Sequence, residues 1–293
     1  MTYNTIIDTM EIKIELSNLN DFNKIELEQY GFVKSVRLDI KENKSYVIIA
    51  LSLNRVKGHY ARINGLRAYN KTFVEVMGMF GVVIQEDIKL NRIDIAIDSE
   101  LKFHDNFKYF LYMFELLSYS DKRADKWYTT NLDTLKNHTI KQLGRNLEIV
   151  FYDKECESKG RHLYNTRMEF RYKRLSSLDF EANLIKLVNF IKNIDVNINL
   201  LNKNMTVRLC RIYDSEVVTD KVKNLSEFVR KYDNYIYTKS ILDGLHKHSS
   251  LKGTSKSWLK KYRERNKLEL FTKTNVKDYQ QKCIKALNLY KKS

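Results

Sequence analysis

The 293-residue sequence contains no proline, three cysteines and no hydrophobic run of membrane-spanning length. Average proline usage of about 5 % would give roughly 15 prolines. The cysteines form no CxxC pair, which excludes a disulfide scaffold and a thiolate zinc site. A membrane helix needs about 20 apolar residues, and no N-terminal stretch resembles a signal peptide. We therefore expect a soluble, cytoplasmic protein with no membrane partner.

Two further kinds of site lack their sequence signatures. No glycine-rich phosphate loop is present, so nucleotide hydrolysis by this chain is not expected. The histidines are scattered singly except for His246 and His248, which lie in a basic, glycine-containing segment. We expect that pair to lie on the surface rather than to bind a metal.

Positive charge is abundant and unevenly distributed. The chain has 52 Lys and Arg against 36 Asp and Glu, a net charge of +16, and 43 % of its residues are hydrophobic. An AT-rich coding sequence would explain the missing proline and some of the lysine. The segment from Ile241 to Ser293, however, carries 14 basic and 4 acidic residues. Codon bias does not explain such a concentration at one end, and a polyanion is its natural partner.

The hydrophobic pattern changes along the chain. Strands are predicted where apolar and polar residues alternate or where apolar, β-branched residues cluster, and helices where apolar residues recur every three or four positions. The predicted strands are 10–16, 46–53, 92–98, 147–154 and 167–173, and the predicted helices are 106–118, 178–191, 226–232, 255–267 and 276–290. This order indicates an α+β fold with a largely antiparallel sheet. We expect an α+β domain over residues 1–200 and a mainly helical, basic, DNA-binding region over residues 201–293.

Three of these strands carry polar side chains on one face, because alternate residues of a strand point to opposite faces. The residues that share such a face are Arg92, Asp94 and Asp98 on the first strand, Tyr152 and Lys154 on the second, and Arg167, Glu169, Arg171 and Lys173 on the third.

The last two of these strands are predicted to form an antiparallel hairpin, since a short connection that includes Glu155 to Tyr164 and contains Gly160 joins them. A register in which paired residue numbers have an odd sum places Tyr152 across from Arg167 or Glu169. An even sum sends the acid to the opposite face.

Such a face suits phosphodiester chemistry. Carboxylates bind Mg²⁺ or Mn²⁺, and an ion of this kind stabilises charge on a leaving oxygen. A tyrosine, whose ordinary pKa is about 10, can attack phosphorus when a metal or a cation such as Lys154 favours the phenolate. The alternative is structural, because an acid beside an arginine on a strand is usually a cross-strand salt bridge.

Three segments of the chain form an ordered set of motifs, namely Arg92-Ile-Asp-Ile-Ala-Ile-Asp98, Phe151-Tyr-Asp-Lys-Glu-Cys-Glu157 and Thr166-Arg-Met-Glu-Phe-Arg-Tyr-Lys173. In order and spacing they resemble the Rep_trans family of rolling-circle plasmid replication initiators and conjugative-element relaxases from Gram-positive bacteria. Ile63-Asn-Gly-Leu-Arg67 is a weaker match. The resemblance covers residues 45–175.

The resemblance implies a role for each matching residue. Tyr152 would be the nucleophile, and Lys154 would contact the scissile phosphate or the phenolate. The implied metal ligands, for Mg or Mn, are Asp94, Glu169 and Asp98. The implied phosphate contacts are Arg92, Arg167, Arg171 and Lys173.

A second basic surface is expected near the C-terminus. On a helix over 255–267, Trp258, Leu259 and Tyr262 form an apolar stripe. The basic residues gathered on a neighbouring face are Lys256, Lys260, Arg263 and Lys267. This face fits phosphate contacts, and the alternative is a solvated amphipathic helix.

The sequence therefore favours a metal-dependent enzyme that nicks DNA at an origin through a 5′-phosphotyrosine intermediate. The scissile DNA would be single-stranded or in a hairpin, a host helicase would unwind the duplex, and the resemblance implies a homodimer. The main alternative is a non-catalytic origin-binding or regulatory protein. An RNA-binding protein is a third possibility, but the stacked-aromatic pattern of the common RNA modules is missing.

Overall fold

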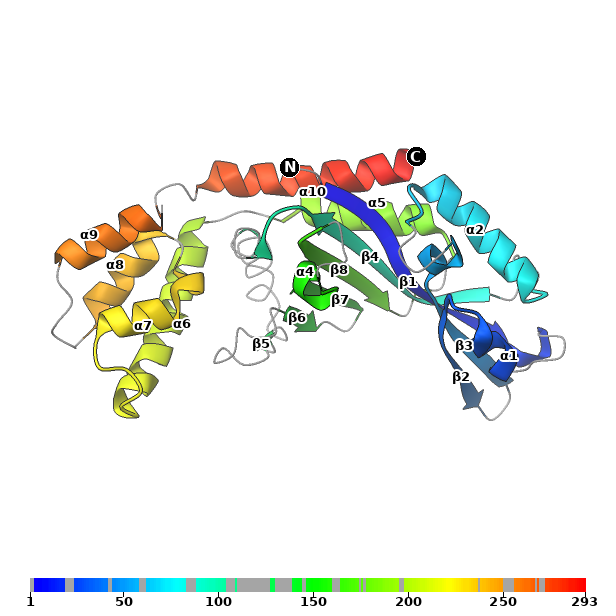
Figure 1. Ribbon diagram of the computed structural model, residues 1–293, viewed down its shortest axis with the longest axis horizontal. Helices are drawn as coiled ribbons and strands as arrows, with labels where there is room; N and C mark the ends of the chain where they lie inside the picture. Colours follow the sequence, from blue (N-terminus) through cyan, green and yellow to red (C-terminus); the bar gives the residue numbers. More distant parts are fainter. Residues whose placement is uncertain are drawn as a thin grey trace. The chain divides into compact units, whose positions relative to one another are not determined.

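The computed structural model contains an antiparallel sheet with helices, which confirms the expected α+β class (Figure 1). The residues that the structure describes are 3–18, 24–41, 44–57, 62–82, 88–103, 109, 127–129, 139–143, 146–159, 164–173, 175, 178–194, 198–236, 238–249, 256–266, 268 and 272–293. Within these residues, no helix is long and apolar enough to cross a membrane.

The chain divides into two compact units. The first, which we call the sheet unit, comprises Met1–Phe103, Arg123–Asn193 and Lys282–Ser293. The second, the helical unit, comprises His104–Lys122 and Ile194–Gln281. The functional division expected near residue 200 stays a prediction.

The described part of the sheet unit contains eight strands in the order β2-β3-β1-β4-β8-β7-β6-β5, and every neighbouring pair is antiparallel. The strands are β1 (Tyr3–Glu15), β2 (Val33–Lys41), β3 (Lys44–Leu51), β4 (Ile88–Ser99), β5 (Trp127–Thr129), β6 (Thr139–Leu143), β7 (Leu147–Asp153) and β8 (Thr166–Lys173). All five predicted strands are confirmed. The helix expected over 106–118 lies outside the described residues except for Tyr109.

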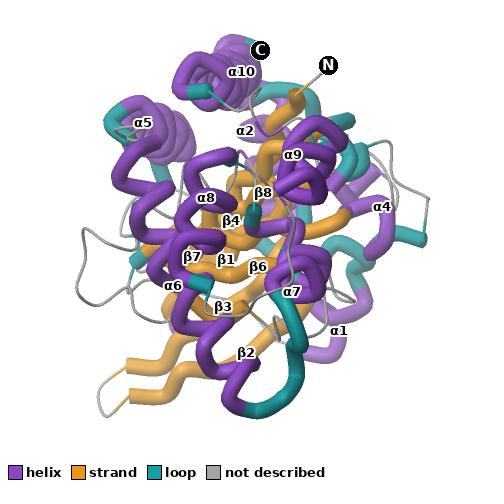
Figure 2. Tube along the Cα trace, turned by 90° about the vertical axis from the view of Figure 1, so that its left-hand side faces the viewer, coloured by secondary structure: helices purple, strands orange, loops and turns teal. Residues whose placement is uncertain are grey.

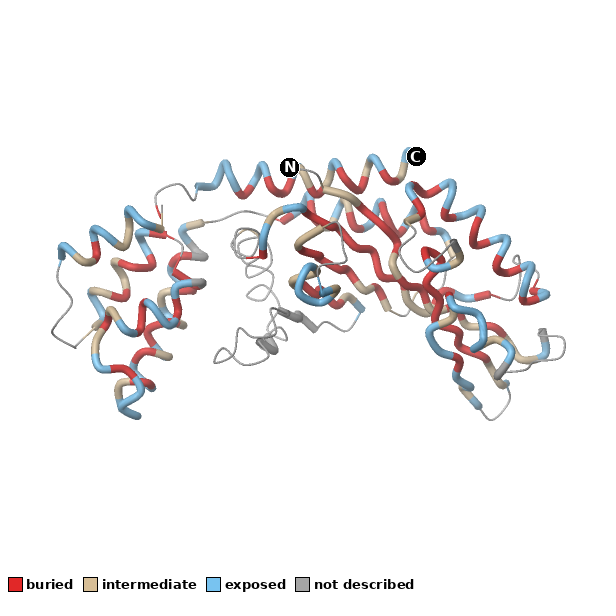
Figure 3. Tube along the Cα trace, viewed as in Figure 1, coloured by how far each residue is buried: buried red, intermediate tan, exposed pale blue. Residues whose placement is uncertain are grey.

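Helices α2 (Leu66–Met79) and α5 (Phe180–Lys192) cover the apolar face of this sheet (Figures 1 and 2). The Phe180 ring lies edge-on to Tyr69 and Phe73, with centroids 5.5 and 5.3 Å apart, and Phe170 of β8 contacts Phe190 of α5. Asp179 caps α5 by accepting a hydrogen bond from the Ala182 amide. Burial is concentrated in the central strands, as Figure 3 shows.

The helical unit is built from α6 (Ile198–Val218), α7 (Leu225–Lys231), α8 (Lys239–His248) and α9 (Lys256–Arg265), together with the first part of α10 (Lys273–Lys292). Helices α6 and α8 cross closely: a Cβ added at Gly244 would lie 2.4 Å from the Thr206 side chain. Phe228 of α7 packs edge-on against Tyr213 of α6. The helices expected over 178–191, 226–232, 255–267 and 276–290 correspond to α5, α7, α9 and α10.

Among the described strands and α-helices, those not predicted from the sequence are β2, β5, β6, α1 (Lys24–Gln29), α2, α4 (Lys154–Glu157), α6 and α8. Strand β2 lies at the edge of the sheet, where Leu38 and Ile40 are exposed, so its pattern is not that of a buried strand. Helix α2 is preceded by Gly65, which has a positive φ of 105° and no side chain to cap the helix. The Ser or Asp that usually marks a helix start in a sequence is therefore missing.

Candidate active site

Strands β4, β7 and β8 bring the predicted polar residues to one face of the sheet. In the β4–β8 pairing, Asp98 lies opposite Arg167 and Asp94 opposite Arg171. In the β7–β8 pairing, Tyr152 lies opposite Arg167, so the hairpin has the odd register. Glu169 therefore shares a face with Tyr152. The other face carries Ile93, Ile95 and Ile97 on β4 and continues into the core.

Tyr152 is held by a direct hydrogen bond to a carboxylate. Its hydroxyl donates to Glu169 Oε1 at 2.6 Å, and Arg167 Nη1 lies 3.9 Å from the same oxygen. Burial raises the pKa of Tyr152, Arg167 lowers it, and Glu169 raises it further, with the net shift upward. The phenol is therefore neutral in this arrangement, with its proton directed at a base.

Lys154 lies beside the tyrosine ring although it is not part of the strand. Strand β7 ends at Asp153, and Lys154 is the first residue of the four-residue helix α4 (Lys154–Glu157). Its Nζ atom lies 5.5 Å from the centroid of the Tyr152 ring and forms an ion pair with Glu157. The predicted lysine thus stays next to Tyr152, but a helix start positions it there.

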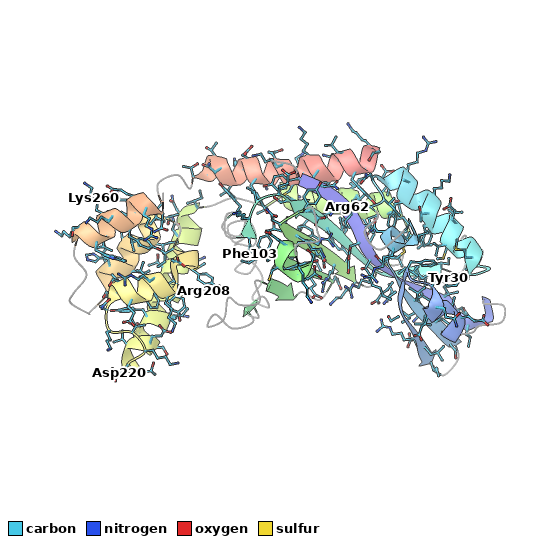
Figure 4. All side chains as sticks on the ribbon, in the orientation of Figure 1. Tyr30, Arg62, Phe103, Arg208, Asp220 and Lys260 are labelled. Atoms are coloured by element: carbon cyan, nitrogen blue, oxygen red, sulfur yellow. The ribbon has the colours of Figure 1, made fainter. Side chains whose placement is uncertain are left out.

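A buried ion-pair group lies next to Tyr152. Asp98 has no exposed surface and accepts two hydrogen bonds from Arg167, at 2.6 and 3.0 Å. Arg62, which is labelled in Figure 4, donates from Nη2 to the same carboxylate at 2.6 Å. Arg167 itself is only 3 % exposed. Its burial favours a positioning role over the predicted phosphate contact.

Asp8 belongs to this group but was missed from the sequence. Its carboxylate accepts a hydrogen bond from Arg167 Nη1 at 3.0 Å, and Lys34 Nζ lies 3.7 Å from it. Asp8 is the extra residue of a β-bulge, because the β1–β4 register shifts between Ile7 and Thr9.

Acid stability tests the placement of Asp8. Burial alone would raise the pKa of Asp8, but Arg167, Lys34 and Lys154 outweigh it and lower the pKa below its ordinary range. The folded chain thus holds this carboxylate ionised to lower pH than the unfolded chain. Its stabilising effect is complete above the unfolded pKa of about 4 and is lost as pH falls further.

When the pH falls from 5 to 3, we expect the unfolding free energy of the wild type to drop by roughly 1–2 kcal/mol more than that of the Asp8→Asn variant. Urea unfolding at both values measures this difference. Equal losses in the two proteins would show that Asp8 does not carry the effect.

Basic side chains lie partly exposed above buried acids at the other end of the face. Arg92 donates two hydrogen bonds to Asp94, at 2.7 and 2.6 Å. Arg171 donates to Glu169 at 2.7 and 3.0 Å and lies 3.3 Å from Glu148, and Lys173 Nζ lies 2.7 Å from Glu148. The acids are no more than 5 % exposed, whereas Arg92, Arg171 and Lys173 are 26 %, 23 % and 38 % exposed. The accessible part of this region is therefore cationic.

The predicted metal ligands lie among arginine side chains. The chemistry of their oxygens suits Mg²⁺ or Mn²⁺. However, Asp94, Asp98 and Glu169 are each bonded to arginine side chains. Among the described residues, no group of three or more His, Cys, Asp or Glu is placed to hold a metal ion. The metal requirement remains a prediction.

The second predicted basic face lies in the helical unit. On α9, Lys256 and Lys260 are exposed, while Arg263 forms an ion pair with Asp243 of α8. Lys267 lies outside the described residues. His248 pairs with Asp214 at 2.8 Å, and both are exposed, whereas His246 is half-buried. The expected surface position is therefore observed for His248.

Comparisons with known proteins give no family assignment. No protein-family model matches the chain, and a search of the curated proteins finds no significant match. A comparison with solved structures matches the chain to a rolling circle replication initiator protein from Geobacillus stearothermophilus. The two share 10 % sequence identity with a TM-score of 0.36, over 66 % of this chain and 85 % of that chain. The Rep_trans resemblance therefore stays a prediction.

Proposed function

We propose that this chain nicks one strand of DNA at a replication or transfer origin and keeps the 5′ phosphate on Tyr152. The observation that carries the proposal is the 2.6 Å hydrogen bond from the Tyr152 hydroxyl to Glu169, beside Lys154 and partly exposed arginines. A nucleophile, a proton acceptor and cations for a phosphodiester thus lie on one sheet face. The Rep_trans resemblance of the same three segments supports this role.

In the proposed reaction, Tyr152 Oη attacks the scissile phosphorus as its proton passes to Glu169. The bond from phosphorus to the 3′ oxygen breaks, and that oxygen takes a proton from Lys154 or water. The products are a 5′-phosphotyrosine and a 3′ hydroxyl that a polymerase can extend. Because the phosphotyrosine retains the energy of the broken linkage, the strand can be rejoined by the reverse reaction without ATP.

The surrounding cations have different tasks. Arg92, Arg171 and Lys173 are exposed enough to contact phosphates on either side of the nick. Arg167 lies between Asp98, Asp8 and Glu169, so we assign it to orienting the acceptor and to stabilising negative charge near Tyr152. A divalent ion, if bound, would stabilise charge on the scissile phosphate. A host helicase and a second copy of the chain are further proposed partners.

The test uses supercoiled plasmid that carries the coding region and its flanks. We expect open circles with protein covalently attached through Tyr152, identified by mass spectrometry of the digested adduct. Parallel reactions with Mn²⁺, with Mg²⁺ and with EDTA decide the metal requirement. Binding without nicking under every condition, on DNA shown by a fragment scan to contain the binding site, would favour a non-catalytic DNA-binding protein.

Changing Glu169 to glutamine tests the proton acceptor. Glutamine keeps the size of the side chain and an oxygen that can accept the Tyr152 hydrogen bond, but it cannot take the proton. We expect cleavage to slow by roughly 10²- to 10⁴-fold, with DNA affinity nearly unchanged. Single-turnover cleavage and fluorescence anisotropy measure the two quantities.

Glu148→Gln is the matched control. Glu148 is an equally buried carboxylate on the same face, paired with Arg171 and Lys173. We expect it to slow cleavage much less than Glu169→Gln. Equal effects of both variants, or equal losses of cleavage and binding in Glu169→Gln, would indicate that Glu169 is only part of a structural salt bridge.

A further inference from the structure

Strand β2 lies at one edge of the sheet and exposes apolar side chains. It pairs with β3 on one side, and no strand of the described part of the chain pairs with its other side (Figure 1). Leu38 and Ile40 are 48 % and 75 % exposed. Leu38 lies opposite the buried Val47 of β3, so both exposed residues belong to the apolar face of the sheet. An open strand edge with exposed apolar side chains is a place where a further strand can add.

The part of β2 that a further strand could pair with is regular. Edge strands are often protected by a proline or by a bulge within the strand. Strand β2 has no proline, and the irregularity in its pairing with β3 lies between Val33 and Ser35. Beyond that point, Ser35–Lys41 pairs with β3 without interruption over seven residues. This stretch is long enough to act as a pairing partner for another strand.

The same stretch is complementary in charge to an antiparallel copy of itself. Full overlap of Ser35–Lys41 with a second copy puts a two-fold axis at its middle residue, Leu38. Arg37 of each copy then lies opposite Asp39 of the other, and opposite charges across a strand pair stabilise it. The two side chains are 59 % and 33 % exposed, and each has an ion-pair partner on β1 of its own chain. The contacts between copies would therefore extend existing ion pairs.

Neighbouring registers place like charges together. Centring the pair on Arg37 would put two arginines face to face, and centring it on Asp39 would do the same with two aspartates. Like charges directly opposite each other destabilise a strand pair. The length of overlap and the charges thus select the same register, the one centred on Leu38.

The apolar side chains also match in this register. Leu38 lies opposite its own copy, and Val36 lies opposite Ile40. Because the two-fold axis is perpendicular to the sheet, the apolar faces of both copies lie on the same side at the junction. Pairing therefore removes apolar surface of Leu38 and Ile40 from water, which favours association.

We propose that two copies of this chain pair through β2, antiparallel and centred on Leu38, so that their sheets join edge to edge. The inference assigns a surface to the second copy named in the proposed function. It does not require that the chain cleaves DNA.

Cysteine cross-linking tests the register. Cys156 is exposed and is first replaced by serine, whereas Cys210 and Cys283 are buried and are kept. In this background we expect Leu38→Cys to form a disulfide-linked dimer under mild oxidation, because the axis brings the two sulfur atoms together. Ile40→Cys should link much less, since it is offset from its copy by four residues, about 13 Å along the strand.

The comparison of these two positions excludes random collision as the cause. Ile40 is more exposed than Leu38, so collisions between monomers would link Ile40→Cys at least as fast. Faster linking of Ile40→Cys, or no linking of either variant, would overturn the proposal.

Sedimentation measures the association without a cross-link. For the full chain we expect a monomer–dimer equilibrium, and Ile40→Lys should raise its dissociation constant about tenfold or more, because the substitution occurs twice at the junction. Leu289→Lys is the matched control, since Leu289 is a 58 % exposed apolar residue on α10, away from the strand edge. A chain that stays monomeric at every concentration, as it would if a different protein added to this edge, would overturn the proposal. Equal effects of the two variants would overturn it as well.

These outcomes separate the interface from the nicking reaction. A dimer linked through Leu38→Cys without plasmid nicking would retain the interface and reject the proposed enzyme. Nicking by a chain that stays monomeric would do the reverse.

Discussion

Replacing Tyr152 by phenylalanine is expected to abolish strand cleavage and covalent attachment while leaving DNA binding nearly intact. Phenylalanine keeps the ring that packs beside Lys154, but it removes the hydroxyl that donates to Glu169. Without that oxygen no phosphotyrosine can form. Loss of a covalent nucleophile typically slows an enzyme by roughly 10⁴-fold or more.

Two measurements check this expectation. Nicking of supercoiled plasmid reports cleavage, and anisotropy with a fluorescent single-stranded oligonucleotide reports binding. We expect the variant to bind within about threefold of the wild type, because the cations of the face remain in place. Nicking by Tyr152→Phe at the wild-type rate would show that another group is the nucleophile.

Tyr164→Phe is a useful comparison. Tyr164 precedes β8 and its ring contacts the Arg62 guanidinium, 4.5 Å from the centroid. Phenylalanine retains this ring contact, so cleavage by the variant should remain close to the wild-type level. Loss of cleavage in both variants would point to the arrangement of the face rather than to the Tyr152 hydroxyl.

The site residues on β4 and β8 could be predicted because alternation determines which side chains share a face. Polar residues at every second position of an otherwise apolar strand are visible without coordinates. The register between β7 and β8 was not predictable, since alternation is equally compatible with odd and even pairings. The structure has the odd register, which places Tyr152 opposite Arg167 and on the face of Glu169.

Asp8 and Arg62 could not be found in the same way. Counting back from Met10 by strict alternation places Asp8 on the apolar face, yet the bulge between Ile7 and Thr9 removes it from that alternation. Arg62 lies in irregular chain before α2, where no periodicity applies. Bulges and loops depend on tertiary pairing, so local sequence patterns do not reveal them.

The partners of the acids were the least predictable feature. The sequence places Asp94, Asp98 and Glu169 on one face and suggests metal ligands, with salt bridges as the alternative. In the structure, each of the three carboxylates is bonded to an arginine that is nearby on the same strand or directly across the sheet. The balance between desolvation, hydrogen bonding and metal affinity decides whether metal ligation or salt bridging of these carboxylates serves the reaction. The pattern of residues along a strand gives none of these quantities.

Changing Asp98 to asparagine is expected to destabilise the fold by roughly 3–5 kcal/mol, the usual cost of leaving a buried charge without its partner. Asp98 is fully buried and accepts hydrogen bonds from Arg167 and Arg62. Asparagine keeps the shape but cannot neutralise two guanidinium groups that are 3 % and 15 % exposed. Lys291→Ala, which breaks a more exposed pair with Glu181, should cost about 1 kcal/mol or less.

Unfolding in urea with EDTA present measures this cost and separates the two roles of Asp98. If Asp98 were needed only as a metal ligand, replacing it would leave the stability of the metal-free protein almost unchanged. If Asp98 is the centre of an ion-pair group, replacing it lowers that stability. The double variant Asp98→Asn with Arg167→Gln completes the cycle. The double variant has one buried charge fewer than the Asp98→Asn single variant. Its loss of unfolding free energy should therefore be smaller than the sum of the losses in the two single variants. Additive losses would mean that the Asp98–Arg167 contact does not stabilise the sheet face on which Tyr152 lies.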